Sequence, residues 1–407
     1  FFKRFYLGCL AHASYFIVDE ETKTAAVIDP QRDIEQYLHQ ATELGVEIKH
    51  VFLTHFHADF VAGHVELHEK CGATIYLGAK AEAEYDFKPL KDGDIVEFGK
   101  IRFSIMETPG HTPEGISIVL FDLNKSDQTP HAVFSGDTLF IGDVGRPDLM
   151  ASIGITAKEL AELLYDSLHQ KLMKLPEETL LYPAHGAGSM CGKSLSTESV
   201  STIGNQKKFN YALQEMSREK FIKLVTADQP EAPQYFGYNA MLNRQKRPVL
   251  EERLKESLKA LTLDEILQLQ SSGVKVLDTR TPEEFASGHL KGSLNIGLNG
   301  KYATWAGTVI DKEQSLVIVA SKGKEEESIL RLGRIGFDKN KGYLEGGFET
   351  IQSHPEHIAT VPQITAKDFI ETQEKGQKPD QVILDVRNCN EWNTEHIEGS
   401  LNIPLSR

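Results

Sequence analysis

Histidine and aspartate side chains follow one apolar segment after another through the first half of the chain. His55 and His57 come after HVFL, His111 after IRFSIMETPG, Asp137 after HAVFSG and His185 after LLYPA. Short apolar segments of this kind are typical of buried strands. Because groups at the ends of successive strands can converge at one edge of a sheet, the order favours an α/β domain with its site there. Imidazole and carboxylate are metal ligands, so the sequence predicts a metal centre.

A block of about 25 residues occurs twice in the C-terminal half. VKVLDTRTPEEFASGHLKGSLNIGL begins at Val274 and QVILDVRNCNEWNTEHIEGSLNIPL begins at Gln381. Aligning Asp278 with Asp385 gives an offset of 385 − 278 = 107 residues, at which LD-x-R, Glu, His and GSLNI agree. Chance is a poor explanation for that agreement. The sequence therefore predicts two copies of one domain, the second cut off by the end of the chain.

The chain of 407 residues is expected to form four segments. QKKFNYALQEMSREKFIKLVTA and RPVLEERLKESLKAL have helical patterns, whereas QPEAPQYFGYNAMLNRQKRP between them is proline-punctuated and poor in periodicity. Tyr235, Phe236 and Tyr238 are costly to expose, so part of this connector should pack on the first domain. The expected segments are a metal-binding domain over 1–205, a helical and extended connector over 206–260, a first repeat copy over 261–355 and the start of a second copy over 362–407.

Charge and cysteine content exclude several classes of protein. The net charge of −15 argues against a general nucleic-acid role, because phosphate binding needs a basic surface. No apolar run approaches the length that spans a bilayer. The four cysteines are widely spaced without a CxxC pair, so no disulfide framework is expected. We therefore expect a cytoplasmic protein that binds neither nucleic acid nor membrane.

The ordered set of HxHxD, GH, a strand-end Asp and a late His resembles the metallo-β-lactamase superfamily over roughly residues 1–200. The resemblance implies an αββα sandwich. In two-metal members the first motif reads HxHxDH, whereas this chain has Phe60 at the last position. A benzyl group supplies no lone pair, so the resemblance implies one metal beside an apolar wall instead of a hydrolytic pair of ions. The implied first site is His55, His57, His111 and Asp137, and the implied second is Asp59, position 60, Asp137 and His185.

Within the superfamily the pattern is most similar to the persulfide dioxygenases, although most of that family has His at position 60. This resemblance implies one Fe(II) per chain, held by His55, His111 and Asp137, with three positions left for substrate and dioxygen. His57, Asp59 and His185 would then orient the ligands or move protons. Phe60 would keep water from the site.

The repeated block, followed by LVIVASKGKEEES and YLEGGF, resembles a rhodanese domain. Rhodaneses carry sulfane sulfur on the cysteine of a CxxGx loop. Gly323 places that position at Ala320, and no cysteine lies between Cys191 and Cys389, so we expect the first copy to be catalytically silent. In the second copy the same position would be 320 + 107 = 427, beyond Arg407. The implied architecture is a metallo-β-lactamase-like domain followed by two rhodanese-like α/β domains, the second incomplete.

Together the resemblances imply a mononuclear non-haem Fe(II) persulfide dioxygenase. The enzyme would oxidise the terminal sulfur of a low-molecular-weight persulfide with O2, giving sulfite and free thiol. It would be coupled to sulfurtransferase modules in sulfide detoxification, with thiosulfate sulfurtransferase activity expected in the full-length protein. Glutathione, coenzyme A, cysteine and bacillithiol persulfides all remain open, and we expect a homo-oligomer.

Three further residues are candidates for handling the substrate. Arg146 or Lys193 is expected to pair with a carboxylate or phosphate of the thiol carrier. Cys191, six residues after His185, either accepts or gates sulfur or is an ordinary buried thiol. We expect the remaining histidines to lie on the surface or to be hydrogen-bonded, namely His12, His39, His50, His64, His68 and His169.

Two alternatives come from the same residues. A thioester hydrolase of the glyoxalase II type would need two metals and no oxygen, and Phe60 argues against it. A non-catalytic sulfur-binding scaffold with a vestigial metal site is favoured slightly by the silent rhodanese copy. The intact His55, His111 and Asp137 oppose that second reading.

Overall fold

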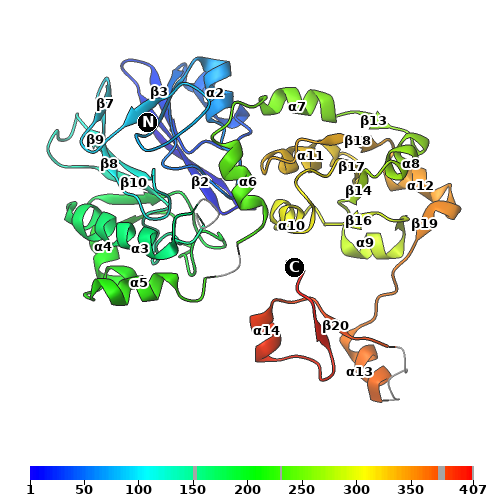
Figure 1. The fold of residues 1–407 in the computed structure, drawn as a ribbon. Coiled ribbons are helices and arrows are strands. Elements are labelled where there is room, and N and C mark those ends of the chain that lie inside the picture. The colour runs from blue at the N-terminus through cyan, green and yellow to red at the C-terminus, as the bar shows by residue number, and fades with distance from the viewer. Residues whose placement is uncertain (150–153, 230–231, 375–380, 406–407) are drawn as a thin grey trace. The chain divides into compact units, whose positions relative to one another are not determined.

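The computed structural model describes residues 1–149, 154–229, 232–374 and 381–405. Contacts divide the chain into two compact units (Figure 1). The first unit comprises residues 1–253 together with 333–336, and the second comprises 254–332 and 337–407.

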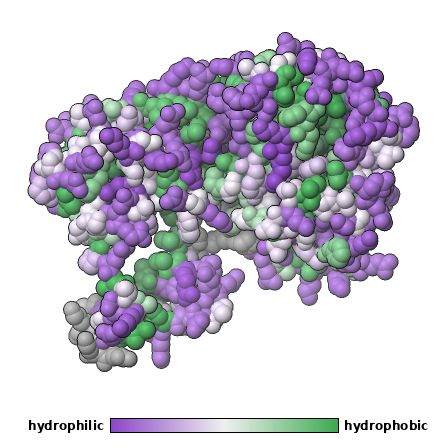
Figure 2. Space-filling model, turned by 180° about the vertical axis from the view of Figure 1, so that it is seen from behind, coloured by the Kyte–Doolittle hydropathy of each residue, from purple (hydrophilic) through white to green (hydrophobic). Residues whose placement is uncertain are grey.

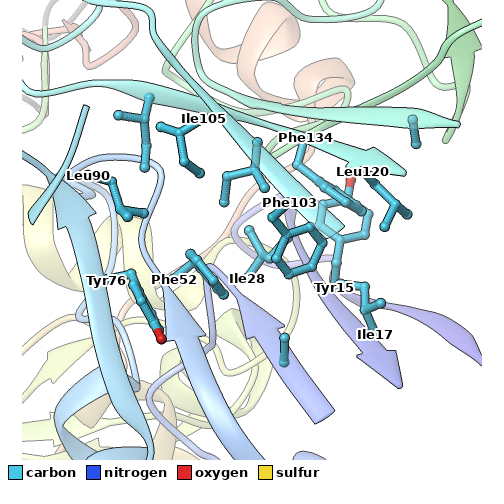
Figure 3. Packing of buried hydrophobic residues seen from close by; sticks show 14 of the residues in the cluster. Tyr15, Ile17, Ile28, Phe52, Tyr76, Leu90, Phe103, Ile105, Leu120 and Phe134 are labelled. Carbon is cyan, nitrogen blue, oxygen red and sulfur yellow. The ribbon is translucent and has the colours of Figure 1, made fainter. Parts of the chain in front are cut away.

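The first unit contains two six-stranded sheets, with strand orders β1-β2-β3-β4-β5-β6 and β12-β11-β10-β9-β8-β7. Inward-facing aromatic and branched side chains of both sheets, among them Tyr15, Phe52, Phe103 and Phe134, form the buried core between them (Figure 3). The strands are β1 (Phe2–Leu7), β2 (His12–Asp19), β3 (Thr24–Ile28), β4 (Glu47–Phe52), β5 (Thr74–Gly78), β6 (Lys88–Leu90), β7 (Ile95–Phe98), β8 (Ile101–Glu107), β9 (Ile116–Asp122), β10 (Ala132–Gly136), β11 (Leu180–Pro183) and β12 (Ser201–Thr202).

Helices cover the outer faces of this pair of sheets, which gives an αββα sandwich. α2 packs on β4 and β5 of the first sheet, and the apolar side chains of α3 and α5 form a second buried cluster with β9, β10 and β11 of the other. The helices are α1 (Glu35–Leu44), α2 (His64–Cys71), α3 (Ala157–Asp166), the π-helical η2 (Ser167–Lys171), the short 3-10 helices η3 (Leu172–Lys174) and η4 (Tyr211–Leu213), α4 (Ile203–Phe209), α5 (Arg218–Thr226), α6 (Tyr235–Leu242) and α7 (Leu250–Ser257).

Two local expectations for the connector were wrong. The helical pattern over 206–227 is interrupted, because α4 ends at Phe209 and α5 begins only after Ser217, whose hydroxyl accepts the N–H of Lys220 at 3.2 Å. The proline-punctuated stretch contains α6. Tyr235 and Phe236 at its start are buried in the first unit, and this burial outweighs the weak periodicity that argued against a helix.

The second unit is built on a five-stranded parallel sheet of order β13-β18-β17-β14-β16. Its strands are β13 (Ala260–Leu261), β14 (Lys275–Asp278), β16 (Leu294–Asn295), β17 (Leu316–Val319) and β18 (Asn340–Leu344), with the two-stranded pair β15 (His289–Leu290) and β19 (Ile358–Ala359). Its helices are α8 (Leu263–Ser271), α9 (Pro282–Ser287), α10 (Tyr302–Val309), α11 (Glu325–Gly333), α12 (Phe348–Gln352) and η5 (Pro355–His357). Ala320 follows β17 and is buried.

The predicted repeat is visible in side-chain contacts. Asp278 pairs with Arg280, whose guanidinium also donates to Gly288 O at 2.9 Å. At the same offset of 107 residues, Asp385 pairs with Arg387, which donates to Glu395 O at 2.7 Å. The second copy begins with α13 (Ala366–Glu374), β20 (Leu384–Asp385), α14 (Cys389–Thr394) and β21 (Leu401–Asn402).

The face of the molecule drawn in Figure 2 is largely hydrophilic, with hydrophobic side chains in small groups. Among the described residues, none of the helices has the length and apolar character that a membrane crossing requires.

Candidate metal centre

Three predicted ligands meet at the ends of strands of the first unit. His55, His111 and Asp137 are buried, and one donor atom of each lies within 4.8 Å of the others. Asp137 Oδ2 lies 3.7 Å from His55 Nε2 and 3.5 Å from His111 Nε2, and it has no hydrogen-bond partner among the described residues. A buried carboxylate oxygen without a partner is costly. Two imidazoles and a carboxylate that face one point without bonding one another fit a bound cation.

The outward nitrogen of each histidine is held by a neighbour. His111 Nδ1 lies 2.8 Å from Arg146 O, and His55 Nδ1 lies 3.0 Å from Thr54 Oγ1. Thr54 Oγ1 in turn donates to Asp29 Oδ2 at 2.9 Å. Bonds of this kind fix the tautomer that presents the Nε2 lone pair to a metal.

Glycines permit the close approach of these loops. Gly136 ends β10 with φ 53°, and a Cβ there would lie 2.4 Å from Thr54 Oγ1. Gly110 has φ 148°, and a Cβ there would lie 2.5 Å from Leu164 Cα in α3. A side chain at position 136 would therefore displace Asp137, and one at position 110 would displace His111, because each is the next residue in sequence.

A second buried group adjoins the first. Asp59, His185 and Cys191 also bring donor atoms within 4.8 Å of one another. His185 Nδ1 lies 2.8 Å from Asp137 Oδ1, and its Nε2 lies 2.8 Å from Asp59 Oδ2. Burial lowers the pKa of His185, but the carboxylates of Asp137 and Asp59 raise it overall to well above the usual value. Burial, reinforced by the same two carboxylates, raises the pKa of the Cys191 thiol well above normal.

Phe60 lies at the side of this second group. Its ring centroid is 4.0 Å from that of His12 and 4.5 Å from that of His57, and the side chain is buried. His57 Nε2 lies 3.0 Å from Asp29 Oδ1. The rings of Phe60, His12 and His57 thus contact one another at tilted angles and form a wall beside the centre, to which Phe60 contributes no donor atom.

The two predicted substrate cations have partners within the protein. Arg146 is 2% exposed, and its guanidinium bonds both oxygens of Asp148 at 2.7 and 2.8 Å and Met190 O at 3.2 Å. Lys193 is exposed, and its ammonium bonds the carbonyls of Leu224 and Ala227 at the end of α5. Their roles in substrate binding stay predictions.

Sequence reasoning missed several residues near the centre. His12 was expected on the surface or hydrogen-bonded, which is wrong, because it is buried and neither of its ring nitrogens has a hydrogen-bond partner among the described residues. Asp29 ends the apolar segment AAVI as Asp137 ends its own strand, so its signal was present. His12 carries no such signal, since it begins β2 and meets His185 only through the fold.

Comparisons with known proteins agree with this arrangement. The family model described as metallo-beta-lactamase superfamily matches residues 7–185, and the rhodanese-like domain model matches residues 262–354. The mitochondrial persulfide dioxygenase ETHE1 of Bos taurus is 30% identical over 234 residues, 56% of this chain and 82% of that protein. The cytoplasmic hydroxyacylglutathione hydrolase of Arabidopsis thaliana is 32% identical over 186 residues, 45% of this chain and 67% of that protein.

Two solved structures are similar as well. A metallo-beta-lactamase from Staphylococcus aureus subsp. aureus COL has a TM-score of 0.75 and 31% identity, covering 84% of this chain and 98% of that chain. ETHE1 from Myxococcus xanthus has a TM-score of 0.52 and 30% identity, covering 60% of this chain and 98% of that chain. These likenesses confirm the predicted fold class. The chain belongs to the metallo-beta-lactamase superfamily, as a fusion of an ETHE1-like domain with a rhodanese-like domain.

Proposed function

We propose that the chain is an Fe(II)-dependent persulfide dioxygenase with one iron held by His55, His111 and Asp137. The observation that carries the proposal is the buried set of two imidazoles and one carboxylate, with Asp137 Oδ2 unbonded at its centre. Iron bound by such a set supplies dioxygen activation and leaves positions for substrate. The ETHE1 relatives, named persulfide dioxygenases, support the choice of reaction.

The proposed reaction is RSS⁻ + O2 + H2O → RSH + HSO3⁻. Both atoms of dioxygen go to the terminal sulfur, and the S–S bond is then broken by water. The sulfur is oxidised and dioxygen is reduced, so no further reductant is needed.

The protein's own side chains have two tasks in this proposal. Phe60, His12 and His57 form a wall of rings that keeps bulk water from the reacting sulfur. His185 holds a proton on Nε2, shared with Asp59 Oδ2, that can pass to the departing thiolate. Asp137 is kept in orientation by the bond between its Oδ1 and His185 Nδ1.

The carrier thiol would be recognised outside the iron site. Lys193 is exposed and can exchange its carbonyl partners for a carboxylate or phosphate of the carrier. The Arg146 guanidinium already binds Asp148, so we expect Arg146 to contribute less than Lys193 to binding of the carrier. Cys191 adjoins Asp59 and His185, but burial raises the pKa of its thiol, which favours an ordinary buried thiol over a sulfur acceptor. In this proposal the protein is a cytoplasmic homo-oligomer in sulfide detoxification. Exchange of sulfane sulfur falls to the second rhodanese copy, because the first has Ala320 at the cysteine position.

A thioester hydrolase is the second candidate. Hydroxyacylglutathione hydrolases match the chain at similar identity, and Asp59, His185 and Cys191 offer donors for a second ion. Phe60 opposes this reaction, because it removes a ligand that a hydrolytic pair of ions would use.

The two candidates are separated by giving Fe(II)-loaded protein glutathione persulfide and S-lactoylglutathione in parallel, with and without oxygen. The dioxygenase proposal predicts oxygen-dependent sulfite from the persulfide and no thioester cleavage above the rate of His111→Ala protein. Oxygen-independent thioester cleavage that needs His111 would reject the proposal in favour of the hydrolase.

A further inference from the structure

The loop that carries His57, Asp59 and Phe60 is held by a side chain far away in the sequence. Asn243 follows α6 and is fully buried. Its Nδ2 donates to His57 O at 2.8 Å and to Phe60 O at 2.9 Å, and its Oδ1 accepts the N–H of Ala62 at 2.8 Å. One amide thus satisfies three buried main-chain groups of the loop.

These three groups lie in a segment that has no regular strand or helix between β4 and α2. A buried main-chain carbonyl or N–H without a partner is costly, so the loop depends on Asn243 for this conformation. The two bonded carbonyls, those of His57 and Phe60, flank Asp59. Fixing them fixes the direction in which the Asp59 carboxylate leaves the loop, toward His185.

Asn243 is itself held at several points. Its N–H bonds Asn239 O at 2.9 Å, and its carbonyl accepts the hydroxyl of Tyr85 at 2.6 Å. Four residues later, Arg247 donates to Ala62 O at 2.6 Å and pairs with Glu66 in α2. Residues 243–247 therefore bond both the loop and α2, the helix that follows it. Hydrogen bonds from neighbouring residues of this kind commonly hold a site in its geometry.

We propose that Asn243 is a positioning residue of the metal centre. Through its bonds to the main chain of residues 57–62 it sets the geometry of the loop that carries His55, His57 and Asp59, and hence the affinity of the centre for the ion. This inference rests on the proposed metal centre but not on the reaction that the centre performs.

The variants Asn243→Ala and Asn243→Asp test the proposal against a matched control. Asn243→Ala removes all three bonds. Asn243→Asp keeps an acceptor for the Ala62 N–H but places its second carboxylate oxygen against the carbonyl oxygens of His57 and Phe60, so it should be at least as harmful. Asn239→Ala is the control, because Asn239 lies one turn earlier, is equally buried, and has no side-chain hydrogen-bond partner among the described residues.

The first measurement is titration of the metal-free full chain with Co(II), followed by visible absorption. We expect a dissociation constant roughly 10- to 100-fold higher for both Asn243 variants, the range for groups that orient metal ligands, and less than about 2-fold higher for Asn239→Ala. The second is hydrogen exchange of residues 54–62 without metal, which should be faster in the Asn243 variants alone.

Unchanged cobalt affinity and loop exchange in Asn243→Ala would overturn the proposal. So would equal changes in Asn239→Ala, since they would indicate only a general loss of packing. Wild-type protein that binds no cobalt would overturn the metal centre and this inference together. Cobalt differences as expected, from protein that does not oxidise persulfide, would support the positioning role and reject only the proposed reaction.

Discussion

Asp137 and His185 are joined by a bond of 2.8 Å between Oδ1 and Nδ1, which leaves Asp137 Oδ2 to face the other two candidate ligands. The other ring nitrogen of His185, Nε2, lies 2.8 Å from Asp59 Oδ2. Burial works against the charge on Asp137, yet the imidazoles of His185, His55 and His111 hold its pKa well below normal. The Asp137 carboxylate therefore contacts both buried groups, His185 through Oδ1 and the candidate ligands His55 and His111 through Oδ2. A substitution in one group should alter the orientation of Asp137 toward the other.

Cys191 should be the least reactive cysteine of the folded protein. Its thiol is buried and its pKa is raised by that burial and by nearby carboxylates, whereas Cys9, Cys71 and Cys389 are partly exposed. The thiolate is the reactive form. Iodoacetamide should label three cysteines of the metal-free native protein and the fourth only after unfolding, as counted by mass spectrometry. Rapid labelling of Cys191 in native protein would contradict this description of the site.

Phe60→His should restore a second metal ion. The new imidazole would stand beside Asp59 and His185, which already offer donor atoms. Equilibrium dialysis against Zn²⁺ is expected to give one ion per chain for wild-type protein and two for Phe60→His. Phe60→Leu is the control, because leucine keeps an apolar side chain without a donor. One ion in all three proteins would show that Phe60 is not what removes the second site.

Arg146→Ala should mainly lower the stability of the protein, whereas Lys193→Ala should mainly weaken substrate binding. Removing buried Arg146 deletes its hydrogen bonds to the partly exposed Asp148 and to Met190 O, so we expect a loss of about 2 kcal/mol in unfolding free energy. Removing exposed Lys193 should cost less than about 0.5 kcal/mol. If Lys193 binds the carrier, its variant should raise KM several-fold with kcat unchanged. Urea unfolding and persulfide kinetics measure the two effects, and an unchanged KM for Lys193→Ala would remove it from the substrate site.

His50 should make the first unit acid-sensitive. Burial in β4, with smaller contributions from Lys88 and Lys49, lowers the pKa of His50 from 6.5 to about 4. Between those values the unfolded chain binds a proton that the folded one does not, so stability present above pH 6.5 falls as pH falls toward 4. His50→Asn should lose less stability than wild type between about pH 7 and pH 5.

Ten of the twelve tyrosines lie in the first unit, so urea unfolding followed by near-ultraviolet circular dichroism of tyrosine reports mainly on this unit. Both tryptophans, Trp305 and Trp392, lie in the second unit, so tryptophan fluorescence provides an internal reference. Equal pH dependence of the tyrosine signal in wild type and His50→Asn would contradict the assignment.

The buried cluster of candidate ligands could be predicted because each candidate follows its own strand. The signal for His55, His111 and Asp137 is local. Antiparallel pairing of β9 with β10 then brings His111 and Asp137 together, whereas His55 comes from the end of β4 in the other sheet. Asn243 could not be predicted in this way. Its bonds reach across more than 180 residues to main-chain atoms, which carry no side-chain identity for a pattern to record. α6, on which it depends, was missed because burial of Tyr235 and Phe236 outweighed the prolines.

Oxygen uptake is the most direct test of iron-dependent persulfide oxidation by this protein. Full-length chain, purified without oxygen and loaded with one Fe(II), would be given glutathione persulfide, with coenzyme A persulfide in parallel and His111→Ala protein as the control. We expect one O2 to be consumed per sulfite formed with at least one carrier, and neither oxygen uptake nor sulfite in the control. Absence of uptake from protein shown to hold one iron, or uptake that survives His111→Ala, would contradict it.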